Sequence, residues 1–457
     1  MPSLTFPTNF RWGTGTASYQ IEGGAHEGGR QPSIWDTFSH TPGRTKDGDT
    51  GDVACDHYHR FADDVELMAQ LHLNSYRFSL AWGRIFDAAG HPNPAGLDFY
   101  SRLVDALLEH GITPQVTLYH WDLPDYLPGG WLNRDTASRF ADYAAIAGKH
   151  LGDRVTNWTT LNEPWCSAFL GYAEGQHAPG HTDPGEALRA AHHLNLAHGL
   201  GVQALRSSVP QADISVVCNL HALKPASDSP GDAAACARLQ RVGNDIWTGP
   251  MLDGRYPAAL FEDTAAYSDW SFVETGDLDL IHQPLDSFGI NYYTSTLVRD
   301  HAMTLSQRQA AGLAPSCWVA DRVECLPPSG PLTTMGWAID PQALTDLLTD
   351  FYSRWPMPVF VSENGAAYPD ALTPDGRIHD QARIDYLDSH MRAVHAAIAA
   401  GVDVTGYYAW SLMDNFEWAH GYSQRFGLAY VDFRTQQRIP KDSFHWYASV
   451  IDAGGLD

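Results

Sequence analysis

Two carboxylates in this sequence stand where apolar segments end, a placement that suits acid and base chemistry. Glu363 follows the run 359–362 and precedes an Asn-Gly turn signal, and Glu163 follows the run 155–162 in an Asn-Glu-Pro setting. β-Branched and aromatic residues in both runs indicate buried strands. Two carboxylates that face each other across a pocket can hydrolyse a glycosidic bond. The alternative is that each acid only caps the helix after its strand.

The elements that position these acids form a regular alternation along the chain. We expect strands at 10–20, 75–82, 113–121, 155–161, 214–220, 285–293, 359–362 and 404–410. We expect helices at 52–71, 97–109, 134–151, 184–206, 232–244, 342–355, 380–400 and 442–451. Strand and helix in alternation imply a parallel sheet, and eight such units favour closure into a (β/α)₈ TIM barrel. An open doubly wound sheet is the alternative, but no GxGxxG phosphate turn follows the first strand.

The chain shows no composition break and no internal repeat. Its 457 residues fit one large barrel, because barrels exceed roughly 400 residues when their βα loops are long. The Gly-rich stretch 23–51 is expected to be one such loop. We therefore predict a single (β/α)₈ barrel catalytic domain over residues 1–457 with long βα loops.

In a parallel barrel the carboxyl ends of all strands face one pocket, so the residues at those ends should meet. They are Gln20, Arg77, His120, Trp121, Asn162, Glu163, Asn291, Tyr293, Glu363 and Trp410, joined by Glu417 and Trp418 from the last loop. Amide, imidazole and carboxylate groups pair with vicinal hydroxyls, and tryptophan supplies a flat apolar wall. The set suits a neutral polyol. Arg77 is expected to orient one carboxylate and keep it ionised, while Trp337 is either core or a platform at the pocket mouth.

Bulk properties exclude several classes of protein. The net charge of −25 argues against a nucleic-acid partner, and no apolar run is long enough to predict a transmembrane helix. The N-terminus lacks the charged and apolar regions of a signal peptide. Six cysteines without CxxC spacing are read as reduced thiols, which favours a cytoplasmic location. No metal is expected, because histidines such as His57 and His59 or His192 and His193 lack a partner carboxylate at a diagnostic spacing.

Ordered motifs run nearly from end to end, at 10–23, 56–60, 76–79, 120–124, 160–164, 291–293, 362–365, 410–418 and 425–428. In these motifs the chain resembles the β-glucosidases of glycoside hydrolase family 1. The resemblance implies a retaining enzyme that needs no metal or cofactor, with Glu363 as nucleophile and Glu163 as acid/base. It implies that Arg77 and Tyr293 contact the nucleophile. The implied substrate-binding residues are Gln20, His120, Trp121, Asn162, Trp337, Trp410, Glu417, Trp418 and Phe426.

The expected function is hydrolysis of terminal non-reducing β-D-glucosyl residues from β-glucosides and short cello-oligosaccharides by a two-step covalent mechanism. One alternative is a 6-phospho-β-glycosidase of the same family, although an ionised Glu417 would repel the phosphate. The other is a sugar-binding protein without catalysis. The expected partner is a small β-glucoside or oligosaccharide, with no nucleic acid and no membrane. The sequence leaves open a homo-oligomer, the natural aglycone, glucose inhibition and transglycosylation.

Overall fold

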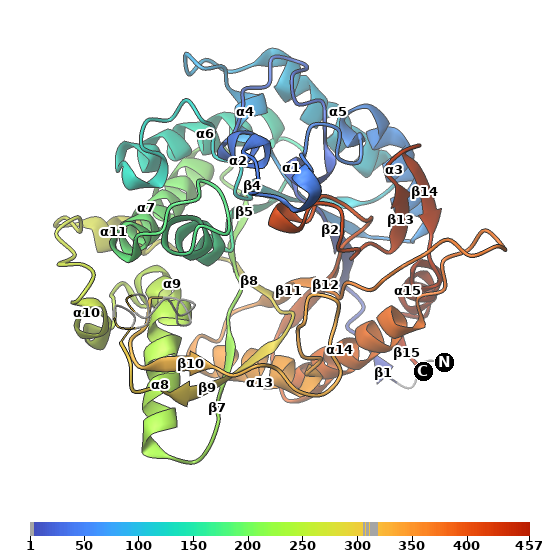
Figure 1. Ribbon diagram of the computed structural model, residues 1–457. Helices are drawn as coiled ribbons and strands as arrows, with labels where there is room; N and C mark the ends of the chain where they lie inside the picture. The colour runs from blue at the N-terminus through green and yellow to red at the C-terminus, as the bar shows by residue number, and fades with distance from the viewer. Residues whose placement is uncertain (1–3, 305–306, 308–309, 311–318) are drawn as a thin grey trace.

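The computed structural model describes residues 4–304, 307, 310 and 319–457. At its centre eight parallel strands close into a barrel inside a ring of helices (Figure 1). In chain order these strands are β2 (Arg11–Gly15), β3 (Ser75–Ser79), β4 (Thr113–Tyr119), β5 (Asn157–Asn162), β6 (Asp213–Cys218), β8 (Ser287–Asn291), β11 (Val359–Asn364) and β12 (Val404–Trp410). The predicted (β/α)₈ barrel is confirmed. Each of its strands overlaps a predicted strand.

The predicted helices are present as well. They are α3 (His57–Gln70), α5 (Pro94–Glu109), α6 (Asp135–Leu151), α7 (Pro184–Ser208), α8 (Pro230–Gln240), α13 (Pro341–Arg354), α14 (Gln381–Ala399) and α15 (Asp442–Ala453). Helices α5, α7 and α13 start with a proline behind an Asn or Asp whose side chain caps the first turn. Helix α3 starts later than predicted because Asp56, just before it, has a left-handed backbone with φ 54°.

Further elements decorate the barrel. The strands β7 (Ala222–Pro225), β9 (Ser295–Asp300) and β10 (Val323–Cys325) form a small sheet beside α8, visible at the lower left of Figure 1. A hairpin of β13 (Ala429–Asp432) and β14 (Gln437–Pro440) follows the last barrel strand, and β1 (Leu4–Thr5) pairs with β15 (Gly455–Leu456). The short α-helices are α1 (Ser18–Ile21), α2 (Ile34–His40), α4 (Trp82–Ile85), α9 (Ile246–Thr248), α10 (Ala258–Thr264) and α11 (Asp277–Ile281).

The expected loop 23–51 contains one of these helices, α2. Its signal is present in the sequence as a capping box. The Ser33 side chain accepts from the backbone N–H of Asp36, and the Asp36 side chain accepts from the N–H of Ser33. The Gly-rich surroundings hid this signal, so the expectation of an unstructured loop is wrong for α2.

Among the described residues four cysteines are free, namely Cys55, Cys166, Cys218 and Cys236. Cys325 is disulfide-bonded, so the expectation of reduced thiols is wrong for this residue. Spacing alone does not reveal such pairing. Cys317 lies outside the described residues.

The described ranges contain neither a membrane-spanning helix nor a cluster of metal ligands. No helix within them has both the length and the apolar character to cross a membrane. The same residues hold no group of three or more His, Cys, Asp or Glu side chains arranged to bind a metal ion.

Candidate active site

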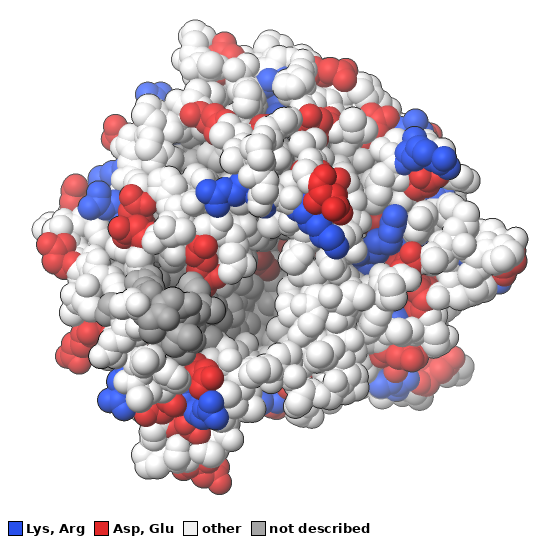
Figure 2. Space-filling view, in the orientation of Figure 1, with Lys and Arg blue, Asp and Glu red and all other residues white. Residues whose placement is uncertain are grey.

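A cavity of about 390 Å³ lies among residues at the carboxyl ends of the barrel strands, and Figure 2 shows the hollow in this face. Eleven of the predicted site residues line it: His120, Trp121, Glu163, Asn291, Tyr293, Trp337, Glu363, Trp410, Glu417, Trp418 and Phe426. The other three predicted residues, Gln20, Arg77 and Asn162, are fully buried and hydrogen-bond to residues of the lining. The barrel therefore brings all fourteen together.

Glu363 is held by two donors. It lies in β11, which is buried at each of its six positions. Nη1 of Arg77 donates to Oε1 of Glu363 at 2.5 Å, and the hydroxyl of Tyr293 donates to Oε2 at 2.7 Å. Burial and the nearby Glu363 raise the pKa of Tyr293 well above its ordinary value, so the phenol remains a donor. A cationic donor and a phenol donor stabilise the carboxylate form of Glu363.

Glu163 has different surroundings. It follows β5 with a left-handed φ of 43°, and its N–H donates to the carbonyl oxygen of Val217. Nδ2 of Asn291 donates to Oε1 at 2.7 Å, and the thiol of Cys166 donates to Oε2 at 3.2 Å. Burial, and then the charge of Glu363, raise the pKa of Glu163 to about 8. The side chain is therefore mostly protonated at neutral pH.

Two asparagines connect the carboxyl groups. Nη2 of Arg77 donates to Oδ1 of Asn162 at 2.5 Å, and Nδ2 of Asn291 donates to the same oxygen at 3.1 Å. One continuous network thus runs from Glu363 through Arg77, Asn162 and Asn291 to Glu163. It holds one carboxyl group among strong donors and leaves the other as an acid, a division that suits a carboxylate pair with separate roles.

Polar atoms at the cavity remain available to a ligand. Nε2 of Gln20 donates to Oδ1 of Asn415 at 3.0 Å, while its Oε1 has no partner within the described part of the chain. Nδ2 of Asn162 donates to Nε2 of His120, whose Nδ1 likewise has no partner among the described residues. Buried polar atoms normally find a partner, so these two are suited to ligand hydroxyls.

Glu417 differs from the sequence-based expectation. Burial, followed by the charges of Glu363 and Glu163, raises the pKa of Glu417 to about 8. The expectation of a standing negative charge is therefore wrong at neutral pH, where most Glu417 side chains are uncharged. The sequence could not reveal this, because the shift arises from burial and from two acids that are distant in the chain.

Aromatic rings form the rest of the wall. His120 stacks on Trp410 and on Trp418, with ring centroids 5.9 Å apart in each pair. Trp337 lies 5.2 Å from Tyr293 and 6.0 Å from Phe426, measured between ring centroids. Trp337 is therefore a residue of the cavity wall, which resolves the choice left open by the sequence. Flat rings of this kind suit the C–H faces of a sugar.

The sequence did not point to several other lining residues, among them Cys166, Asn219, His221, Met335 and His420. Cys166 had a signal, since it lies three residues after Glu163 in the helical segment that follows β5. A turn joins the two residues, because the N–H of Cys166 donates to the carbonyl oxygen of Glu163 at 2.9 Å. Asn219 and His221 follow the end of β6, which is also a position expected to face the pocket.

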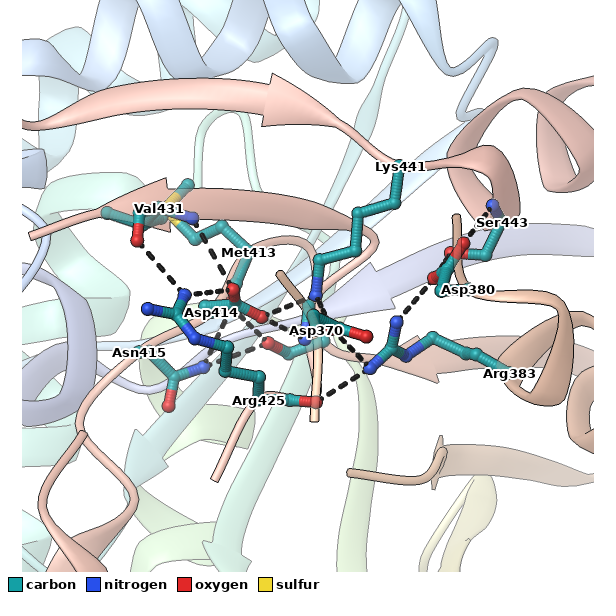
Figure 3. A network of polar contacts seen from close by, with 12 residues as sticks. Asp370, Asp380, Arg383, Met413, Asp414, Asn415, Arg425, Val431, Lys441 and Ser443 are labelled. Carbon is teal, nitrogen blue, oxygen red and sulfur yellow. Dashed lines mark hydrogen bonds and ion pairs between the residues drawn. The ribbon is translucent and has the colours of Figure 1, made fainter. Parts of the chain in front are cut away.

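A buried ion network supports the loops that carry Glu417, Trp418 and Phe426 (Figure 3). Its members are Asp370, Asp380, Arg383, Asp414, Arg425 and Lys441. Nζ of Lys441 donates to Oδ1 of Asp414 at 2.7 Å and also pairs with Asp370. Asp414 precedes Glu417 by three residues, and Asp370 follows Glu363 by seven. The network therefore joins the segment that follows Glu363 to the segment that precedes Glu417.

A parallel barrel whose strand ends hold two buried carboxyl groups, amides and tryptophans is the arrangement of a barrel glycosidase. The chain belongs to glycosyl hydrolase family 1, whose family model matches residues 3–456. It is 53% identical to a bifunctional beta-D-glucosidase/beta-D-fucosidase of Bifidobacterium breve over 98% of both chains. It is 44% identical to beta-glucosidase A of Thermotoga maritima over 99% of both chains. A solved structure of a Thermotoga maritima beta-glucosidase in complex with deoxynojirimycin superposes with a TM-score of 0.92 at 43% identity, covering 99% of this chain and 100% of that one.

Proposed function

We propose that this protein is a retaining β-glucosidase that removes terminal non-reducing β-D-glucosyl residues from β-glucosides. The observation that carries the proposal is the pair of buried carboxyl groups, Glu363 among donors and Glu163 with its pKa raised, on the walls of one cavity. Membership in glycosyl hydrolase family 1 and relatives named as β-glucosidases support it. Short cello-oligosaccharides are included among the proposed substrates.

In the first step, the carboxylate of Glu363 attacks the anomeric carbon while the bond to the leaving oxygen breaks. Glu163 donates its proton to that oxygen, so the aglycone departs as a neutral alcohol. The product is a glycosyl ester on Glu363. Arg77 and Tyr293 hold the attacking carboxylate in place through the hydrogen bonds to its two oxygens.

In the second step Glu163 acts as a base. Ester formation removes the negative charge of Glu363, which is one cause of the raised pKa of Glu163. That pKa therefore falls, and Glu163 takes a proton from the water that attacks the anomeric carbon. The ester bond breaks, Glu363 becomes a carboxylate again, and glucose leaves with its β configuration retained.

The remaining residues hold the sugar. We assign the glycone hydroxyl groups to Gln20, His120, Asn162, Glu417 and Trp418. Trp410 forms the floor, and Trp121, Trp337 and Phe426 complete the aromatic wall. The free acceptor on Gln20 and the free ring nitrogen of His120 support this assignment.

Hydrolysis of nitrophenyl β-glucoside tests the proposal, with proton NMR used to identify the first sugar anomer released. We expect β-glucose first, followed by slow mutarotation. α-Glucose as the first product would contradict the retaining mechanism, and sugar binding without turnover would indicate a binding protein. Nitrophenyl β-fucoside belongs in the same panel because of the bifunctional Bifidobacterium breve relative.

Two further proposals concern the whole chain. Residues 1–457 form one catalytic domain, which predicts a single cooperative unfolding transition.

The protein works in the cytoplasm, and the four free thiols fit a reducing compartment. The disulfide at Cys325 does not favour that location, so activity should be followed through cell fractionation.

A further inference from the structure

The hydrogen bonds around Glu163 determine which of its oxygens carries the acidic proton. Arginine has only donors, so the contact from Nη2 of Arg77 makes Oδ1 of Asn162 an acceptor. The Asn291 amide lies 3.1 Å from the same oxygen and must therefore present its Nδ2 to it. In this orientation Oδ1 of Asn291 accepts from Oγ of Ser362 at 2.6 Å.

The orientation of Asn291 determines which oxygen of Glu163 accepts a hydrogen bond. Nδ2 of Asn291 lies 2.7 Å from Oε1 of Glu163, and an amide nitrogen cannot accept a hydrogen bond. A carbonyl oxygen accepts a hydrogen bond better than the hydroxyl oxygen of an acid, so this short contact favours Oε1 as the unprotonated oxygen. The proton of the neutral acid is then assigned to Oε2, the oxygen that lies 3.2 Å from Sγ of Cys166.

Cys166 is well placed to act on that oxygen. It starts the π-helical segment Cys166–Ala173 after β5, is buried, and lines the cavity. Nδ2 of Asn219 donates to its Sγ at 3.6 Å, which fixes the sulfur from the β6 side. Burial, together with Glu163, raises the pKa of Cys166 well above its ordinary value, so the group is a neutral thiol. A neutral thiol can donate or accept, weakly in both cases.

We propose that Cys166 is a positioning residue for the acid/base, acting on Oε2 of Glu163. The thiol donates to Oε2 when Glu163 is ionised and turns to accept when Oε2 is protonated. Because a thiol is a weak partner, the proton remains available to the leaving oxygen. This inference rests on the proposed function, since it assigns the same residue as acid and base.

Other groups also act on Glu163, and each must stay constant in a test. Apart from Cys166 and Asn291, those that face it are Arg77 on β3, Cys218 on β6, Tyr293 after β8, Glu363 on β11 and Glu417 after β12. Substitutions at Cys166 leave all of these in place. A change in the pH profile then reports the partner of Oε2.

The test compares Cys166→Ser and Cys166→Val with wild type, using kcat/KM against pH for phenyl β-glucoside. A hydroxyl is a stronger donor than a thiol, so Ser should stabilise the carboxylate and move the alkaline limb down by about half a pH unit or more. Val removes the donor and keeps water out, so the limb should move up by a similar amount. Cys236→Ser, at a free cysteine in α8, is the matched control and should keep the wild-type profile.

Leaving-group dependence separates positioning from a general loss of structure. Phenyl glucoside needs a proton at its leaving oxygen, whereas dinitrophenyl glucoside does not. In Cys166→Val the loss of kcat/KM for the phenyl substrate should exceed that for the dinitrophenyl substrate by about tenfold, the scale of a general-acid contribution partly lost. Equal losses for both substrates, or limbs that move in the same direction in Ser and Val, would overturn the inference. A wild type without glucoside hydrolysis would instead overturn the proposed function.

Discussion

Arg77 and Glu363 form an ion pair that is almost fully withdrawn from water, with exposed side-chain fractions of 0% and 4% and an Nη1–Oε1 distance of 2.5 Å. An isolated buried charge is costly, so each partner depends on the other. The same guanidinium reaches Asn162 and, through it, the network around Glu163. One arginine on β3 thus stabilises the carboxylate of Glu363 and orients the amides that surround the acid.

Removal of the nucleophile should abolish hydrolysis. Glu363→Ala leaves no group that can form the glycosyl ester, because the other lining acids are assigned to the leaving oxygen and to the sugar hydroxyls. We expect kcat to fall at least about a thousandfold, which corresponds to about 4 kcal/mol of barrier. Steady-state kinetics with nitrophenyl β-glucoside measures the loss.

Azide supplies the control for that variant. It fits the space vacated by the carboxylate and attacks the same face of the sugar, so it should restore part of the activity and yield α-glucosyl azide. Full activity of Glu363→Ala without azide would refute the assignment of the nucleophile.

Substitution of the acid should produce a leaving-group effect. Glu163→Gln cannot protonate the leaving oxygen, so poor leaving groups should suffer about 10²–10⁴-fold and good ones far less in the first step. With dinitrophenyl glucoside the glycosyl-enzyme should accumulate, because the variant also lacks the base for the second step. Mass spectrometry of the quenched reaction checks this. Equal losses across a series of aryl glucosides would contradict the acid/base role.

The direction in which kcat/KM changes with pH follows from the raised pKa of Glu163. Glu163 must be protonated for the first step, and its pKa is raised to about 8. The kcat/KM value for a poor leaving group should therefore hold at neutral pH and fall as the pH rises through that region. Glu163→Gln should lose this alkaline limb. A limb of the same shape in the variant would assign it to another group, with Glu417 as the first candidate.

The barrel and the carboxylate pair could be predicted because each depends on local signals repeated along the chain. Apolar runs that end in Glu163 and Glu363 give both the strands and their acids. The helix α2 was missed among glycines although its Ser33 capping box is visible. The raised pKa of Glu417 and the Cys166 contact were beyond prediction, because they arise from distances between side chains that only the closed barrel defines.

Lys441 should matter for stability. Its ammonium group is fully buried between Asp370 and Asp414. Lys441→Met leaves two buried carboxylates facing each other without this cation, so we expect a loss of about 3–5 kcal/mol in the free energy of unfolding. Urea denaturation followed by fluorescence measures it. Lys441→Arg, which keeps the charge, should lose less.

Arg102→Met is a matched control on the surface. Arg102 pairs with Asp98 within α5, and both side chains are more than half exposed. Exposed pairs contribute about 0–1 kcal/mol, so this variant should unfold close to wild type. A loss at Lys441 no larger than that at Arg102 would show that the buried ion network does not stabilise these loops.

The enzyme should discriminate against a 6-phosphorylated glucoside. The sequence suggested repulsion by an ionised Glu417, but that side chain is mostly neutral at pH 7 because its pKa is raised to about 8. A stronger reason is the lining itself, which contains no lysine or arginine among its described residues. A phosphate with a charge of about −1.5 to −2 therefore finds no cationic side chain in this lining with which to form an ion pair. The wild type should therefore cleave nitrophenyl β-glucoside and leave its 6-phosphate nearly untouched at pH 6 and at pH 8.

The charge of Glu417 should appear as a pH dependence of that preference. Glu417 is neutral below pH 8 and charged above it, so the ratio of kcat/KM for glucoside over 6-phosphate should rise between pH 7 and pH 9. The ratio cancels the protonation of Glu163, which both substrates share. Glu417→Gln should remove this pH dependence of the ratio. At pH 7 Glu417→Ser should lose about 0.5–1.5 kcal/mol of binding to the neutral sugar, since the hydrogen bond of a neutral carboxyl group is lost, and should accept the phosphate slightly better. A wild type that prefers the 6-phosphate would show that Glu417 does not contact the sugar as assigned.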